Sequence, residues 1–248
     1  MPAVLVHGVP ETAELWEDLR PHLGRNDVVA LSLPGFGCER PGGFEATMDA
    51  YAGWLIGQLE RIKAHEGPID LVGHDWGGGL VVRAVSLRAD LVRSWVSDAA
   101  GLGDHEFEWH EFAKIWQTPE AGEQFWEGML AASPEDRGSA IEGSGVPHDK
   151  AVAVAAEVDE TMAQCILSLY RSAINVGADW GPAFTDIAKP GMVFVPELDA
   201  FLNADHARRA ARRAGAQVQE LAGLGHWWML QDPAGTGALL RDFWASLG

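Results

Sequence analysis

The stretch from Ile69 to Gly79 constrains the fold of this chain more than any other. It reads IDLVGHDWGGG, so an apolar run enters a turn with flanking glycines, and a helical run follows. This is the pattern of a nucleophile elbow, a tight strand-to-helix turn that presents one reactive residue between two glycines. The backbone of the central residue is strained. Only glycine fits at the second position before it and at the second position after it. That residue is Asp75, and we expect its carboxylate beside a helix N-terminus.

A carboxylate at this position indicates a particular chemistry. It suits attack at a saturated carbon, which displaces a leaving group and forms an alkyl ester on the enzyme. Water must then attack the carboxyl carbon of that ester, and this step needs a general base and an oxyanion hole. A lone Gly-x-Asp-x-Gly is more typical of a glycine-rich turn with a helix-capping aspartate, so this interpretation depends on partners elsewhere in the chain.

Suitable partners follow in the sequence. Asp199 and His226 each come just after a predicted strand, and the order nucleophile, acid, histidine is that of the α/β-hydrolases. Glu197 and Asp98 are rival acids because they also follow strands, but we favour Asp199. The segment Gly-Leu-Gly before His226 also favours a catalytic turn.

The rest of the chain alternates short apolar runs with helical ones, which predicts an α/β fold with a mostly parallel sheet covered by helices. Catalytic groups are then expected at the carboxyl ends of the strands. The expected strands are 3–6, 27–33, 69–73, 92–97, 191–196 and 216–221, and the expected helices are 11–23, 44–65, 78–88, 203–215 and 232–247. The alternation stops in residues 103–185, which are helical and aromatic, so we expect a cap there over a core formed by 1–102 and 186–248.

Composition limits the partners. The net charge is −18, from 36 acidic and 18 basic residues, which argues against binding to nucleic acid or to an anionic membrane. Two cysteines and no visible secretion signal favour the cytoplasm, and no apolar run approaches the ~20 residues of a membrane span. We expect a small apolar substrate, a monomer or homodimer, and neither cofactor nor metal.

Four segments resemble one branch of the α/β-hydrolase superfamily. They are His-Gly-Val-Pro-Glu at 7–11, Gly-His-Asp-Trp-Gly-Gly at 73–78, Pro-Glu-Leu-Asp at 196–199 and Gly-His-Trp at 225–227. Together they are similar to the branch with an aspartate nucleophile, which holds epoxide hydrolases, haloalkane dehalogenases and fluoroacetate dehalogenases. The pair of strands that usually precedes the first segment is missing, so we expect about six strands.

The resemblance implies a role for each matching residue. Asp75 would attack carbon, and His226, oriented by Asp199, would activate water. The backbone N–H groups of Val9 and Trp76 would form the oxyanion hole. Members of the branch differ in how they stabilise the leaving oxygen or halide.

Epoxide hydrolases of this branch protonate the ring oxygen with two donors from the cap, usually tyrosines. Tyr170, within the segment Leu-Tyr-Arg-Ser-Ala, resembles one of them, and a neutral phenol with a pKa near ~10 suits that role. His110 follows Trp109 as in members that pair a histidine with the tyrosine, so it is the candidate second donor. The leading interpretation is therefore an epoxide hydrolase that needs no cofactor.

Two alternatives stay open. A haloalkane dehalogenase would hold halide with the indole of Trp76 and a second donor, for which Trp109 or Trp116 is available. A catalytically silent ligand-binding member of the fold is the other alternative. Fluoroacetate dehalogenases carry an arginine directly after the nucleophile, where this chain has tryptophan, so a carboxylate substrate is disfavoured. The expected walls of the substrate pocket are Trp76, Trp109, Phe112 and Trp227.

Overall fold

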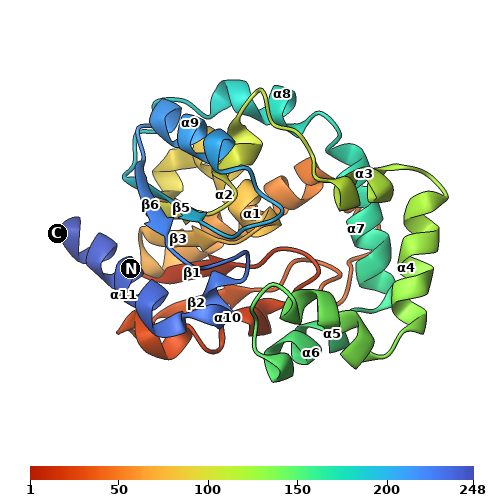
Figure 1. Cartoon of the computed structure of the whole chain (residues 1–248). Coiled ribbons are helices and arrows are strands. Elements are labelled where there is room, and N and C mark those ends of the chain that lie inside the picture. Colours follow the sequence, from red (N-terminus) through yellow and green to blue (C-terminus); the bar gives the residue numbers. More distant parts are fainter.

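A single parallel sheet forms the centre of the molecule (Figure 1). The computed structural model describes all 248 residues. It contains six strands in the order β2-β1-β3-β4-β5-β6, and every neighbouring pair is parallel. The strands are β1 (Ala3–Val6), β2 (Val28–Leu31), β3 (Ile69–Gly73), β4 (Val92–Ser97), β5 (Gly191–Pro196) and β6 (Gln217–Leu221). The prediction of about six mostly parallel strands is confirmed.

Each central strand is apolar on both sides, because helices cover both faces of the sheet. In β1, Val4 and Val6 join the larger apolar cluster, whereas Ala3 and Leu5 join the smaller one on the opposite face. In β5 the same alternation repeats residue by residue. The period of two along a strand therefore divides the core into two layers.

The larger layer lies under α1 (Met48–Glu66), α2 (Trp76–Arg88) and α9 (Ala204–Ala214), and the smaller under α10 (Trp228–Gln231) and α11 (Pro233–Ser246). Figure 1 shows α1, α2 and α9 together on one side of the sheet and α11 on the other. The helix α9 illustrates why the sequence packs this way. Its alanines form the buried stripe and its arginines form the outer face, at helical spacing.

The expectation of one helix over residues 11–23 is wrong. This segment forms two short 3₁₀ helices, η1 (Ala13–Trp16) and η2 (Arg20–Leu23). Pro21 has no N–H to donate and disfavours the α conformation in the residue before it. A continuous α-helix through this position would therefore lose a backbone hydrogen bond and be destabilised. The apolar spacing still brings Leu15, Trp16 and Leu19 into the smaller layer.

Between β4 and β5 the chain contains no strand. It forms α3 (Glu111–Gln117), α4 (Ala121–Ala131), α5 (Pro134–Glu142), α6 (His148–Ala156), α7 (Glu160–Ser172) and α8 (Val176–Trp180). Helices α3, α4 and α7 pack against one another, as do α5 and α6. Figure 1 shows α3 to α7 gathered at one end of the sheet. The limits 103 and 185 of a separate cap stay a prediction. None of the helices combines the length and the apolar character needed to cross a bilayer.

The strand order places the site. From β1 the chain crosses to β2 on one side, and then returns to β3 on the other side of β1. Loops that leave β1 and β3 at their carboxyl ends therefore diverge around a crevice, which is where parallel α/β sheets bind ligands. Val6 pairs with Gly73 in this register, so the segment 7–11 and the elbow begin side by side.

Candidate active site

The elbow adopts the strained turn that its sequence predicts. Asp75 has φ 51° and ψ −123°, a conformation that residues with a Cβ rarely adopt. A Cβ on Gly73 would lie 2.3 Å from the Gly77 carbonyl oxygen, and one on Gly77 would lie 2.2 Å from that of Val6. Both glycines are thus required by close backbone approach, and the turn can form only with them.

The carboxylate of Asp75 contacts the backbone at the start of the loop after β1. The backbone N–H of Val9 donates to Asp75 Oδ1 at 2.9 Å. A Cβ on Gly8 would lie 2.3 Å from the same oxygen, so glycine is needed there to admit the side chain. Trp76 begins α2 and its backbone N–H donates to no protein group, as is usual in the first turn of a helix. Of the two predicted oxyanion donors, the Val9 N–H thus contacts the carboxylate, and the Trp76 N–H has no protein acceptor.

His226 and Asp199 complete the constellation. Asp199 Oδ2 lies 2.8 Å from His226 Nδ1, and His226 Nε2 lies 3.7 Å from Asp75 Oδ2. An ionised carboxylate only accepts, so Nδ1 carries the proton and Nε2 offers a lone pair. The 3.7 Å separation is too long for a direct hydrogen bond and leaves this lone pair free for a water molecule.

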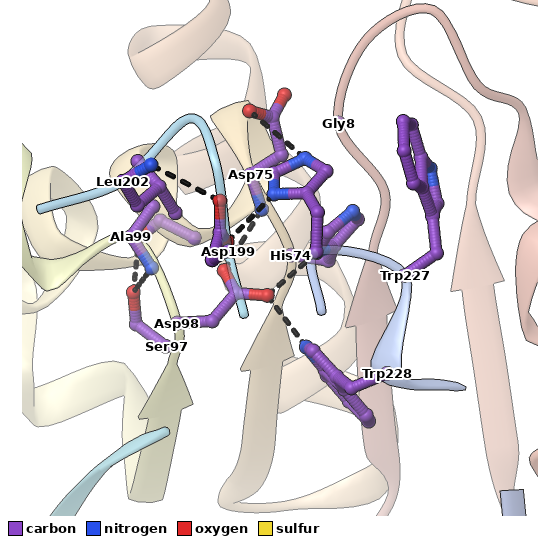
Figure 2. A network of polar contacts seen from close by, with 12 residues as sticks. Gly8, His74, Asp75, Ser97, Asp98, Ala99, Asp199, Leu202, Trp227 and Trp228 are labelled. Atoms are coloured by element: carbon purple, nitrogen blue, oxygen red, sulfur yellow. Dashed lines mark hydrogen bonds and ion pairs between the residues drawn. The ribbon is translucent and has the colours of Figure 1, made fainter. Parts of the chain in front are cut away.

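The loop after β5 holds Asp199 in place. Its Oδ1 accepts the backbone N–H of Phe201 at 2.7 Å. It also accepts that of Leu202 at 3.1 Å (Figure 2). Burial opposes its ionisation, but His226 and these N–H groups outweigh that effect and lower the pKa of Asp199. The rival Glu197 instead accepts the Gly223 N–H at an exposed position, and Asp98 faces His74.

The nucleophile candidate is costly to ionise. Burial raises the pKa of Asp75 to about 6, against the opposing effects of His226, His74 and the Val9 N–H. Burial also disfavours the charged form of His226, yet the neighbouring Asp199 carboxylate raises its pKa. The charges of Asp75 and His226 interact across 3.7 Å, so their protonation is a property of the pair.

A cavity of about 60 Å³ opens above Asp75 and His226. Two candidate donors, His110 and Tyr170, share its wall with the carboxylate. The lining is Val9, Pro10, Asp75, His110, Trp116, Tyr170, Phe201, His226 and Trp227, which includes no arginine or lysine. The cap side chains and the sheet-edge loops therefore enclose one small space.

His110 is a neutral N–H donor in this setting. Its Nδ1 accepts the Ala113 N–H at 3.2 Å as the N-cap of α3, so the ring proton resides on Nε2. Burial, assisted by the charge of His226, lowers the pKa of His110 to about 4. The sequence signal Trp-His found this residue, and its helix-capping role, which sets the tautomer, was visible only in the structure.

Tyr170 lies on α7 with 2% of its surface exposed. Its ring packs edge-on against Trp76 and Trp116. Burial first, and the Asp75 carboxylate second, raise the pKa of Tyr170 well above its ordinary value. The hydroxyl therefore keeps its proton at all ordinary pH values, and Tyr170 lines the same cavity as Asp75.

The aromatic wall differs from the expected one. Only Trp227 of the four expected residues lines the cavity. Trp109 stacks on Trp76 and donates its indole N–H to the Ala173 carbonyl at 2.9 Å. Phe112 is 47% exposed, because it lies on the outer face of α3. Trp116 and Phe201 take their places, and no local signal marked either residue.

One group of side chains has donor atoms close enough to hold a metal ion. Atoms of Glu11, His74 and His226 lie within 4.8 Å of one another. Glu11 already accepts the Trp227 indole N–H, and His226 is engaged by the two aspartates. The arrangement fits protons shared among buried groups, and we assign no metal to it.

Comparison with known proteins identifies the class. The model of the alpha/beta hydrolase family matches residues 3–239, so the chain belongs to that family. The (E)-2-((N-methylformamido)methylene)succinate hydrolase of Acinetobacter baylyi is 32% identical over 94 residues, which is 37% of this chain and 35% of that protein. Lipase LipV of Mycobacterium tuberculosis is 32% identical over 91 residues, covering 37% and 34%. The matched part thus spans about a third of each curated relative.

Solved structures superpose on nearly the whole chain. A Pseudomonas aeruginosa protein assigned as an epoxide hydrolase superposes with a TM-score of 0.77 at 20% identity, covering 99% of this chain and 89% of that one. The haloalkane dehalogenase DbeA from Bradyrhizobium elkani has a TM-score of 0.73 at 20% identity, with 99% and 90% covered. At this identity the likeness establishes the fold.

Proposed function

We propose that this protein is a cofactor-independent epoxide hydrolase that opens a small apolar epoxide to a diol through an alkyl ester on Asp75. The observation that carries the proposal is the shared cavity. Tyr170 and His110, two neutral proton donors, line the same small space as the Asp75 carboxylate and the His226 ring. An epoxide needs a nucleophile on carbon and an acid on oxygen at once, and this cavity provides both.

In the first step, the Asp75 carboxylate attacks a ring carbon. A carbon–oxygen bond forms to the enzyme and the ring carbon–oxygen bond breaks. The released oxygen takes a proton from Tyr170 or from His110 Nε2. Because burial keeps both donors neutral, either can give up a proton to an alkoxide, which is a stronger base than phenolate or imidazolate.

In the second step, His226 Nε2 takes a proton from water as the water oxygen attacks the carboxyl carbon of Asp75. The negative charge develops on the oxygen next to the Val9 and Trp76 N–H groups. The ester bond then breaks and the diol leaves with a proton from His226. The second proton of the attacking water, left on the Asp75 carboxyl, returns to the Tyr170 or His110 anion, which restores the starting state. The 2.8 Å contact with Asp199 stabilises the imidazolium formed on the way.

The lining limits the substrate. A cavity of about 60 Å³ is small beside the ~300–1,000 Å³ of typical ligand pockets, so an epoxide of few carbons fits best. Trp116, Phe201 and Trp227 provide apolar contact. No cationic side chain lines the cavity to pair with a substrate carboxylate, which favours neutral substrates.

A single turnover in water enriched in heavy oxygen tests the covalent route. With enzyme in excess over a short terminal epoxide, the label must enter the Asp75 carboxylate, because water attacks the ester carbonyl. The first diol released must carry ordinary oxygen. Heavy oxygen in the first diol would contradict the ester route and indicate direct attack by water.

Replacement of Tyr170 by phenylalanine should slow ring opening on the order of 100-fold, since a positioned acid contributes about 10²–10⁴ to such a step. Hydrolysis of the ester should change little, because the hydroxyl is not needed there. Rapid-quench kinetics separate the two steps. Tyr51→Phe is the matched control, because the Tyr51 hydroxyl donates to the Pro34 carbonyl, remote from the cavity. An unchanged rate of ring opening would remove Tyr170 from the mechanism.

The rate of ester formation should fall at low pH. Attack requires ionised Asp75, whose pKa of about 6 lies above that of an ordinary aspartate. The ionised fraction increases with pH through that value, so the rate should rise towards a plateau above about pH 7. Single-turnover measurements in His226→Gln isolate this step from His226 titration, and because the substitution removes the charge that lowers the Asp75 pKa, the midpoint in this variant should lie above 6. A rate constant independent of pH from 4.5 to 8 would contradict this assignment.

A haloalkane dehalogenase is the second candidate, and one observation favours it. The indole N–H of Trp116 is buried without a protein partner and Trp116 lines the cavity, so this group can hold a halide. Trp109 is less suitable because its indole N–H is already bonded. Halide release from short bromoalkanes, with no diol from any epoxide tested, would favour haloalkane dehalogenase activity over epoxide hydrolysis.

A further inference from the structure

Behind the catalytic groups lies a second set of ionisable side chains that the two steps above do not use. Glu11, His74 and Asp98 have side-chain exposures of 0%, 0% and 1%. They come from three separate places: the loop after β1, the elbow, and the loop after β4. Groups this deeply buried are costly to keep charged unless each is paired.

Asp98 holds the elbow. Its Oδ1 accepts the backbone N–H of Asp75 at 2.9 Å. Its Oδ2 accepts the Trp228 indole N–H at 2.7 Å and lies 2.5 Å from His74 Nδ1. Figure 2 shows this carboxylate between the His74 ring and Trp228. Because Asp98 meets donors on both oxygens, it is a carboxylate that only accepts.

Glu11 does the same for the loop that carries Val9. Its Oε2 accepts the Gly8 N–H at 2.9 Å. Its Oε1 accepts the Trp227 indole N–H at 2.8 Å and lies 3.3 Å from His74 Nε2. Both oxygens again meet donors, so Glu11 is ionised too.

The positions of the protons follow from these contacts. His74 Nδ1 lies 2.5 Å from Asp98 Oδ2, and His74 Nε2 lies 3.3 Å from Glu11 Oε1 in an ion-pair contact that lacks hydrogen-bond alignment. A neutral ring would place a lone pair against one of those oxygens, which is repulsive. Both nitrogens therefore carry a proton, and His74 is a buried cation between two anions.

We propose that His74 is a positioning residue, a buried imidazolium that ties the loop bearing Val9 to the elbow bearing Asp75. Through Glu11 it holds the Gly8 backbone, and through Asp98 it holds the Asp75 backbone. These contacts of Glu11 and Asp98 with the backbone thus fix the distance between the Val9 N–H and the Asp75 carboxylate. Its role in catalysis rests on the proposed function, whereas its charge and contacts do not.

The surrounding groups support this charge. Burial disfavours a charged His74, but Asp98 and Glu11 outweigh it and raise the pKa well above the ordinary value. Burial likewise opposes ionisation of Glu11, yet His74 in particular brings its pKa down to about 2. His226 also faces His74, with ring centroids 4.6 Å apart. Asp75 stands next in the chain, so the His74 charge favours the ionised nucleophile while Glu11 opposes it.

His7 provides an internal comparison. It is also fully buried, but its Nδ1 lies 2.8 Å from the Gly8 carbonyl oxygen and its Nε2 accepts the Leu33 N–H. One nitrogen must therefore donate and the other accept, so His7 is neutral. Burial lowers its pKa to about 4, in agreement with these contacts.

The first experiment uses the unmodified protein. Nitrogen-15 NMR of labelled histidine at pH 8 should show two protonated ring nitrogens for His74 and one for His7. Assignment follows from His74→Gln and His7→Asn, each of which removes one set of signals. A single protonated nitrogen on His74 overturns the proposal, and this result does not depend on any substrate.

The second experiment measures the Asp75 carboxyl by carbon-13 NMR as pH is varied. His74→Gln should raise the midpoint of this titration, and Glu11→Gln should lower it, each by about half a pH unit or more. A purely structural role predicts no such opposite pair. Shifts in the same direction, or none, overturn the proposal. Neither measurement needs turnover, so failure of the epoxide assignment would leave this test intact.

Discussion

His226→Gln should accumulate the alkyl ester. The substitution removes the base for the second step but leaves the Val9 N–H to Asp75 contact of 2.9 Å untouched. Ring opening should proceed while ester hydrolysis slows about 10²–10⁴-fold. Trypsin releases residues 64–83 as one peptide that contains Asp75, and mass spectrometry should find the mass of one epoxide on it.

Two variants make that result specific. His148→Gln changes an exposed histidine that pairs only with Glu142 at the surface, and it should show full turnover and no added mass. The double substitution Asp75→Ala, His226→Gln should lose the added mass. Normal turnover in His226→Gln, with an unmodified peptide, would contradict the role proposed for this residue.

Asp75→Ala should abolish turnover, with a loss on the order of 10⁴-fold or more, because residues that act as one catalytic unit are not replaced by the rest. No other carboxylate lines the cavity, so no substitute nucleophile is at hand. Asp90→Ala, at an exposed ion pair with Arg88, is the matched control and should keep full activity. Residual turnover above one hundredth of the unmodified rate would contradict nucleophilic attack by Asp75.

The ionised Asp75 carboxylate that attack requires should also lower the stability of the fold. The pKa of Asp75 rises from 3.8 to about 6 on folding, so the folded state binds the proton more tightly than the unfolded state. Above about pH 6 the ionised carboxylate therefore destabilises the fold, by about 2–3 kcal/mol when fully ionised. Asp75→Asn should raise the free energy of unfolding at pH 7.5, and the gain should shrink towards pH 4. Urea unfolding at both pH values measures it; a variant less stable at pH 7.5 would contradict the assignment.

Local patterns were sufficient for much of the fold. The alternation of strands and helices and the glycines around Asp75 follow from interactions between near neighbours in the chain. Asp199 and His226 were instead indicated by their positions after strands and by an order that matches the α/β-hydrolases. The helix expected over 11–23 shows the limit of such patterns. Its apolar spacing correctly indicates a buried face, but Pro21 divides it into η1 and η2.

The sequence by itself determined the elbow, because strain in a tight turn selects glycine within a few residues, and it determined that the residue presented there is an aspartate. Only the tertiary structure decided which aromatic residues line the cavity: Trp116 and Phe201 do, while Trp109 and Phe112 do not. It alone brought Glu11 and Asp98 to opposite sides of His74. These contacts join segments far apart in the chain, and their geometry depends on the order of strands in the sheet, which no local pattern encodes.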